Sequence, residues 1–279
     1  MRFKFLALFA FLVVSNAVPV SAQETDKPKP EATPKAVKKD RKPNDKPPAN
    51  GSEKSVSAEQ VAESAVIAYS GLGGREYLKQ IRKTTVERGK ISIVNNEGKT
   101  EQATYEKLIL RGDNLEKERV RFDQSFPSAR YALIYNNDKI FGVFNEAVFT
   151  PREDATKAFE NQIWHGLEAL LRYKENGSTI ALGEKEKIMN VEFYVLDVTD
   201  KQKRQTKFYI SSKTLRVMML EYQEKGVKLR RKFYDYNYAQ GTLVPFRSVL
   251  WANDKQIEET NIQTISFGQK VEEDVFKES

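Results

Sequence analysis

The sequence contains no cysteine and only one histidine among its 279 residues. Without cysteine the folded part has no disulfide, so its core must hold it together even in an oxidising compartment. One histidine cannot supply the usual ligands of zinc, and a histidine-activated nucleophile would depend wholly on His165. We interpret His165, which follows Trp164, as an ordinary helix residue beside a sheet. No metal and no cofactor are expected.

Pairs of carboxylates are the other candidate catalytic groups, because a glycosidase needs two carboxyl groups that face each other across a cleft. The pairs in this chain alternate with Lys or Arg, which is typical of a solvated strand face. The glycine-rich turn at Gly71–Gly74 follows an expected helix rather than a strand, so we interpret it as a helix cap and not a phosphate loop. We therefore predict no enzyme, with a hydrolase as an alternative that would require a polar cleft. The pairs are Glu116/Glu118, Glu184/Glu186, Glu258/Glu259 and Glu272/Glu273/Asp274.

The N-terminus has the three parts of a secretory signal. Arg2 and Lys4 give a positive start, Phe5–Val14 an apolar stretch, and Val20-Ser21-Ala22 a small-residue cleavage site. The apolar stretch is short for a hydrocarbon core of about 30 Å, so an uncleaved anchor is the weaker alternative. We predict a signal over residues 1–22 and a periplasmic or secreted protein.

Residues 23–55 contain six of the ten prolines, many lysines and no aromatic residue. Such a segment cannot bury enough apolar surface to offset its ordering entropy, so we predict a disordered linker. Of the formal net charge of +7, residues 1–22 carry +2 and residues 23–55 carry +3, which leaves +2 for residues 56–279. The charge therefore indicates a basic linker in contact with lipid headgroups or cell wall, and no nucleic-acid partner.

Residues 56–279 are predicted to form one mainly β (α+β) domain. Ser57 and Gln60 fit a capping box that opens a first helix, a short helical piece follows at Arg75–Gln80, and an apolar face predicts one long helix at Pro151–Arg172. Elsewhere the pattern has period two, with turn residues every 8–14 positions, so neighbouring strands must be antiparallel. About 11–12 strands in one sheet should curl into a half-barrel, with helices covering the concave face. The expected strands are Ile81–Val94, Glu101–Leu110, Leu115–Phe122, Arg130–Tyr135, Lys139–Asn145, Thr179–Lys187, Val191–Val198, Thr206–Ile210, Leu215–Gln223, Val227–Tyr238, Leu243–Trp251 and Gln256–Phe267.

The apolar faces of these elements allow two interpretations. They form either an ordinary core or, in part, a cavity that holds acyl chains, for which flexible methionine and aromatic side chains are suited. The residue pattern alone leaves both open. The candidate cavity and lid residues are Tyr131, Leu133, Tyr135, Phe159, Ile163, Trp164, Leu167, Leu171, Val217, Met219, Phe246 and Leu250.

Three segments resemble a known family. The C-terminal part, with Tyr234–Tyr238, then Gly241–Phe246 and finally Val271–Phe276, resembles the ending of LolA-like proteins, the outer-membrane lipoprotein-sorting and lipid-carrier superfamily that includes LolB-like receptors. Phe208–Arg216 resembles the strand–turn–strand of that family, with Ser211 where an Asp is common, and Phe126–Arg130 resembles the segment before its helices. The resemblance covers about residues 57–277. It implies an incomplete, strongly curved antiparallel barrel with helices at its open side and a hydrophobic cavity for acyl chains.

The favoured hypothesis is therefore a periplasmic or cell-envelope carrier or sorting protein, possessing no catalytic residues, that holds lipid or lipoprotein acyl chains. A monomer is expected, with an association to the outer membrane implied by the resemblance. The alternative is a structural or scaffold module of the envelope, whose curved sheet packs entirely on itself while the linker does the binding.

Overall fold

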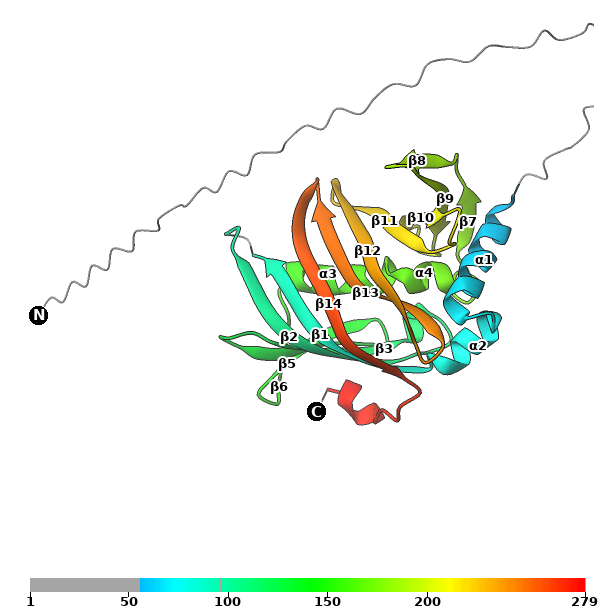
Figure 1. The fold of residues 1–279 in the computed structure, drawn as a ribbon. Coiled ribbons are helices and arrows are strands. Elements are labelled where there is room, and N and C mark those ends of the chain that lie inside the picture. The colour runs from blue at the N-terminus through cyan, green and yellow to red at the C-terminus, as the bar shows by residue number, and fades with distance from the viewer. Residues whose placement is uncertain (1–55, 96, 279) are drawn as a thin grey trace, which may run out of the picture. The chain divides into compact units, whose positions relative to one another are not determined.

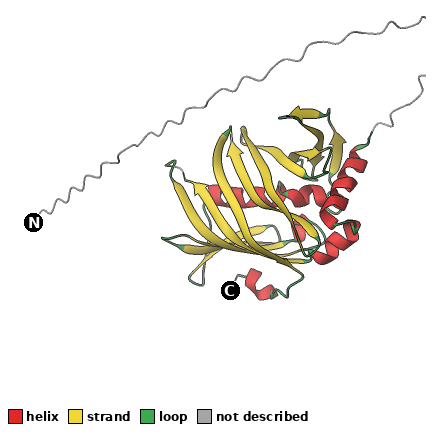
Figure 2. Ribbon diagram, viewed as in Figure 1, coloured by secondary structure: helices red, strands yellow, loops and turns green. Residues whose placement is uncertain are grey.

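The structure is a computed structural model that describes residues 56–95 and 97–278. The predicted signal peptide and linker lie outside the described residues. Within them, one antiparallel sheet of 14 strands curves around helices that gather inside and at one end of the curve (Figures 1 and 2). The predicted mainly β, curved antiparallel fold is confirmed.

The first and last strands of the chain pair with each other in the middle of the sheet. The strand order is β6-β5-β4-β3-β2-β1-β14-β13-β12-β11-β10-β9-β7, with β8 paired to β9, so the first and last strands are neighbours and β6 and β7 are the edges. The sheet is therefore open, and its two halves are consecutive hairpins on either side of the β1–β14 pair. The strands are β1 (Thr84–Val94), β2 (Thr100–Leu110), β3 (Arg119–Ser125), β4 (Arg130–Asn136), β5 (Lys139–Phe144), β6 (Ala147–Phe149), β7 (Thr179–Leu182), β8 (Glu186–Ile188), β9 (Val191–Thr199), β10 (Gln205–Ser211), β11 (Val217–Glu224), β12 (Val227–Ala239), β13 (Thr242–Ala252) and β14 (Lys255–Phe267).

The strand count differs from the predicted 11–12 for local reasons. The expected strand at Thr179–Lys187 is interrupted after Leu182 and becomes β7 and β8, and the short edge strand β6 was missed. The expected strand at Leu115–Phe122 starts instead as a 3-10 turn, η1 (Leu115–Lys117), because the Asn114 side chain accepts a hydrogen bond from the Lys117 amide and caps a helical turn.

The helices follow their predicted caps except at one glycine. Helix α1 (Ala58–Ser70) begins with the predicted capping box of Ser57 and Gln60, and α2 (Gly74–Ile81) follows it. The single long helix predicted over Pro151–Arg172 is wrong, because the segment forms α3 (Glu153–Trp164) and α4 (Leu167–Leu171). The break is at Gly166, whose backbone is extended (φ −80°, ψ 179°) and which has low helix propensity.

The core lies on the concave side, between the sheet and the helices. Tyr69 of α1, Phe159 of α3 and Leu170 of α4 pack in one hydrophobic cluster with inward residues of both halves of the sheet. Figure 1 shows α3 and α4 crossing behind β12–β14 on that side. The C-terminal 3-10 turn η2 (Glu273–Phe276) packs separately, with Phe276 against Ala132 and Ile134 on the other face of the sheet. Helices α3 and α4 therefore cover any cavity that remains on the concave side of the sheet.

Candidate ligand site under helices α3 and α4

A cavity of about 230 Å³ lies between the concave face and the junction of α3 with α4. Inward residues of β1, β2, β3 and β11–β14 line one side, and the segment from Asn161 to Glu168 lines the other. Its walls include the rings of Tyr105, Phe122, Tyr222 and Phe233. Pockets for drug-sized ligands occupy about 300–1,000 Å³, so this cavity has room for part of a lipid rather than for a whole one.

A second, open space lies beneath the first half of α3. This groove, of about 690 Å³, has Leu229, Leu250 and Ile257 on the sheet side. Asn161, Tyr222 and Glu258 line both the groove and the cavity, so the two spaces adjoin. The other side of the groove carries charged side chains at the start of α3, Arg152, Glu153, Asp154 and Lys157.

The cavity wall carries charges as well as apolar groups. Arg231 donates to Glu258 at 2.8 Å and to the Ser248 hydroxyl at 3.1 Å. The Tyr105 hydroxyl donates to Glu87 at 2.7 Å. Lys107 lies opposite Glu87 across the β1–β2 pair, and its Nζ atom is 5.6 Å from the centre of the Phe122 ring. The expected purely hydrophobic lining is therefore replaced by a mixed one.

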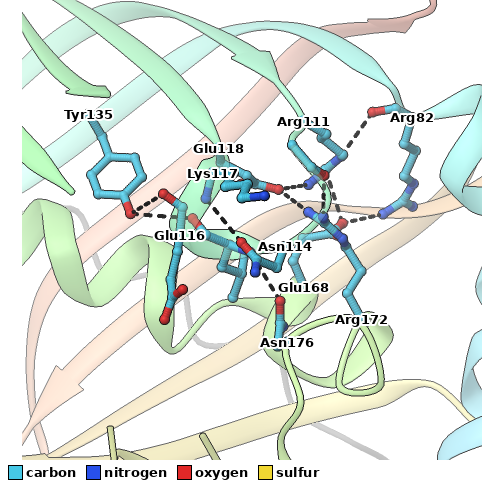
Figure 3. Close-up of polar contacts among 12 residues, drawn as sticks. Arg82, Arg111, Asn114, Glu116, Lys117, Glu118, Tyr135, Glu168, Arg172 and Asn176 are labelled. Carbon is cyan, nitrogen blue, oxygen red and sulfur yellow. Dashed lines mark hydrogen bonds and ion pairs between the residues drawn. The ribbon is translucent and has the colours of Figure 1, made fainter. Parts of the chain in front are cut away.

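One end of the cavity is closed by a cluster of five ionised side chains, drawn in Figure 3. Glu118 accepts hydrogen bonds from Arg111 at 3.0 Å and from Arg172, and Glu168 accepts from Arg82 and from Arg111, each at 3.1 Å. Three guanidinium groups thus surround two carboxylates. We call these five residues the ion cluster.

The ion cluster favours the charged form of Glu168 despite the burial of this carboxylate. Burial opposes ionisation of Glu168, but the nearby Arg111, Arg82 and Arg172 outweigh it and hold the pKa of this carboxyl below its ordinary value. Glu118 is only 3% exposed, and both of its ion-pair partners are arginines, Arg111 and Arg172. The cluster also lines an outer groove that contains Arg75 and Lys117, so it separates the cavity from the surface at this end.

His165 occupies the break between α3 and α4. Its ring is buried, stacks parallel to Tyr222 at 4.1 Å and has its Nδ1 atom 2.6 Å from the Thr206 hydroxyl oxygen. Burial, helped by the positive charge of Arg204, lowers the pKa of His165 to about 4. The ring is therefore neutral in the fold and serves to position the α3–α4 junction over the sheet.

Acidification should destabilise the protein through His165. The unfolded chain binds a proton at this ring near its ordinary pKa of about 6.5 and the folded chain does so only near 4, so stability falls as pH drops through that interval. The loss expected from this ring is about 3 kcal/mol by pH 4. Urea unfolding at pH 7, 5.5 and 4.5 measures it, and the loss should be absent in His165→Gln. Parallel pH profiles for the two proteins would contradict this account.

The structure places the predicted site residues in several different surroundings. Ile163 and Leu167 line the cavity, and Leu250 lines the adjoining groove. Met219 packs with Phe193 and Tyr209 in a separate cluster, and Phe246 is partly exposed outside the clusters. The remaining predicted residues belong to or pack against the main core: Tyr131, Leu133, Tyr135, Phe159, Trp164, Leu171 and Val217.

The sequence did not predict that charged residues would line the cavity. The interpretation of Glu116/Glu118 and Glu258/Glu259 as solvated pairs is wrong for Glu118 and Glu258, which are 3% and 9% exposed. Their burial is tolerated because each meets an arginine from another element. The alternation of residues in β2 could have predicted a buried charge, because Lys107 shares the inward face of this strand with Tyr105 and Ile109.

A single open antiparallel sheet, curved around helices on its concave side, is the architecture of LolA-like proteins. The chain superposes on a LolA superfamily protein from Nitrosomonas europaea (TM-score 0.57, 11% identity, 80% of this chain and 98% of that one). It also superposes on a DUF1329 family protein from Desulfovibrio piger (TM-score 0.56, 13% identity, 78% and 96%). A Vibrio parahaemolyticus domain described as outer membrane lipoprotein-sorting matches with TM-score 0.50 at 12% identity, over 79% and 95%.

These likenesses confirm the LolA-like fold inferred from the sequence. No protein-family model and no curated protein matches the sequence. Among residues 56–95 and 97–278, no helix is long and apolar enough to cross a membrane.

Proposed function

We propose that this protein is a cell-envelope carrier or sorting protein that binds an acyl chain of a lipid or lipoprotein beneath α3. The observation that supports the proposal is the pair of adjoining spaces under that helix, one a groove with Leu229, Leu250 and Ile257 on its sheet side and the other a cavity walled by four aromatic rings. Burial of a chain there would supply about 0.8 kcal/mol per methylene without covalent chemistry. In this proposal residues 1–22 direct export and are cleaved, residues 23–55 tether the domain to a membrane or wall surface, and residues 56–279 bind the ligand as a monomer.

Helix α3 has the attachments expected of a lid. Its first turns are held to the β11–β12 hairpin by Glu153, which pairs with Lys225 at 2.7 Å, and by Lys157, 4.0 Å from Glu224. Exposed ion pairs of this kind contribute little to stability. Its second half is anchored by Phe159 and Ile163 and ends at the break before Gly166. The first half of α3 can therefore lift from the groove while the anchored half stays in place.

The direct test is to look for co-purified lipid and then to close its site. Native mass spectrometry of the protein released from membranes should show bound lipid. Ile163, which lines the cavity, is 6% exposed, so Ile163→Phe fills the cavity and should lower lipid occupancy at least tenfold. Ile163→Val leaves the space open and is the matched control, expected to keep its lipid. Protein that carries no lipid, or equal occupancy in both variants, would contradict the proposal.

A scaffold role is the second candidate, favoured by the dense packing of most of the concave face. Tyr69, Phe159, Phe208 and Leu220 are at most 1% exposed, so little of that face is free for a ligand. If the protein is a scaffold, replacing Trp164 should reduce stability without altering any lipid occupancy. A ligand-specific effect of that substitution would instead favour the carrier.

A further inference from the structure

Lys107 is the one inward-facing cation of the cavity wall that has no carboxylate partner within 4.0 Å among the described residues. Arg82 and Arg111 pair with Glu168, and Arg231 pairs with Glu258, whereas the Lys107 Nζ atom lies 5.6 Å from the centre of the Phe122 ring. Burial lowers the pKa of Lys107, and the nearby carboxylates of Glu87, Glu258 and Glu118 offset this only in part. An ammonium group in this position is stabilised by any anion that enters the cavity.

The cations and carboxylates that line the cavity are equal in number. The wall contains four cations, Lys107, Arg82, Arg111 and Arg231, and four carboxylates, Glu87, Glu118, Glu168 and Glu258. Each arginine has a carboxylate partner, whereas Lys107 and Glu87 face each other across the β1–β2 pair with no ion pair within 4.0 Å among the described residues. Lys107 is therefore the cation of the wall that is available to an anion entering the cavity.

The cavity and the groove both combine charged and apolar side chains. Lys107 lies in the cavity wall, and Leu229, Leu250 and Ile257 provide an apolar surface on the sheet side of the groove that adjoins it. A head group at Lys107 would thus point its chain toward the groove beneath α3. The small cavity suits a compact head group better than a phosphodiester with further substituents.

We propose that the cavity binds the carboxylate of a monocarboxylic acyl amphiphile, with Lys107 as its cationic partner and the chain lying toward the groove. The proposal rests on the proposed function for the binding of the chain, and adds the chemical class of the head group. Glu87 lies across the β1–β2 pair from Lys107 and accepts a hydrogen bond from the Tyr105 hydroxyl. The Glu87 carboxylate repels a bound carboxylate and therefore limits the affinity of the site for it.

The test compares octanoate, 1-octanol and octylammonium by calorimetric titration of the full chain. The wild type should bind octanoate at least tenfold more tightly than 1-octanol. Lys107→Met should lower octanoate affinity at least tenfold and leave 1-octanol unchanged, while Lys107→Arg should keep most of the octanoate affinity. Glu87→Gln should raise octanoate affinity. Urea unfolding of each variant checks that the fold is intact.

The outcomes separate the head group from the chain. Equal binding of octanoate and 1-octanol, unaffected by Lys107→Met, would overturn the carboxylate site and leave the acyl-chain function standing. Tightest binding of octylammonium would overturn it in favour of a cation at Glu87. Acetate bound as tightly as octanoate would remove the chain from the proposal. If none of the eight-carbon probes binds and no lipid co-purifies, the proposed function itself fails.

Discussion

Glu118→Gln is expected to lower the free energy of unfolding by about 3–5 kcal/mol, because it removes one carboxylate from a buried ion cluster. Glu118 is the carboxylate partner of Arg172, whose other contact, at 2.7 Å, is the Gly112 carbonyl oxygen. Arg111 keeps Glu168, at 3.1 Å, so the uncompensated charge falls mainly on Arg172. Urea unfolding monitored by circular dichroism measures the change.

An exposed ion pair of the same types is the matched control for this substitution. Glu273 pairs with Arg119 at 2.8 Å, and its side chain is 63% exposed. Glu273→Gln should therefore leave the free energy of unfolding nearly unchanged. A drop of similar size in both variants would show that burial does not strengthen the cluster. Replacing Glu118 and Arg172 together by Met should recover part of the loss, since the unpaired buried charge is then absent.

The sequence predicted the elements of this fold well because their periodicities are local. Alternating residues marked nearly every strand, and the capping box at Ser57 marked the start of α1. The pairing of β1 with β14 is different in kind, since it joins strands at opposite ends of the folded part. The number of strands and the resemblance to LolA-like proteins both predicted a curved sheet, but neither predicted that β1 pairs with β14.

The candidate site was less predictable. Whether a side chain points toward the concave face depends on β-bulges and on the residues that pack against it from distant elements. Val217 and Met219 are two residues apart and should share a face, yet Val217 packs in the main core and Met219 in a separate cluster. The register between β10 and β11 shifts at Tyr209/Ile210, so an extra residue of β11 intervenes and reverses the alternation.

Buried charges escaped prediction for a related reason. Glu118 becomes acceptable inside the fold only when Arg111 and Arg172, which belong to other segments, converge on it. Nothing in the spacing of these three residues shows that they meet. Lys107, in turn, has no carboxylate within 4.0 Å among residues 56–95 and 97–278, which is visible only once the ion pairs around the cavity are known.

Phe159→Ala should cost about 3–5 kcal/mol of stability, because it leaves a void where α3 is anchored to the sheet. The Phe159 side chain is 1% exposed, and its ring stacks on that of Phe122, with the ring centres 6.2 Å apart. Urea unfolding measures the loss, and Phe144→Ala, at a side chain 45% exposed, is the control expected to stay within about 0.5 kcal/mol.

The same substitution probes the ligand site, because Phe122 forms part of the cavity wall. Removing the ring behind Phe122 lets that wall move back and enlarges the space for a chain. If α3 covers an acyl chain, Phe159→Ala should shift the preference from octanoate toward decanoate in a titration carried out well below the unfolding midpoint. A large loss of stability with no change in chain-length preference would mean that Phe159 anchors the helix without bordering the ligand. An unchanged stability would mean that α3 is not held to the sheet by this ring, and the proposed division of the helix into an anchored half and a mobile half would be wrong.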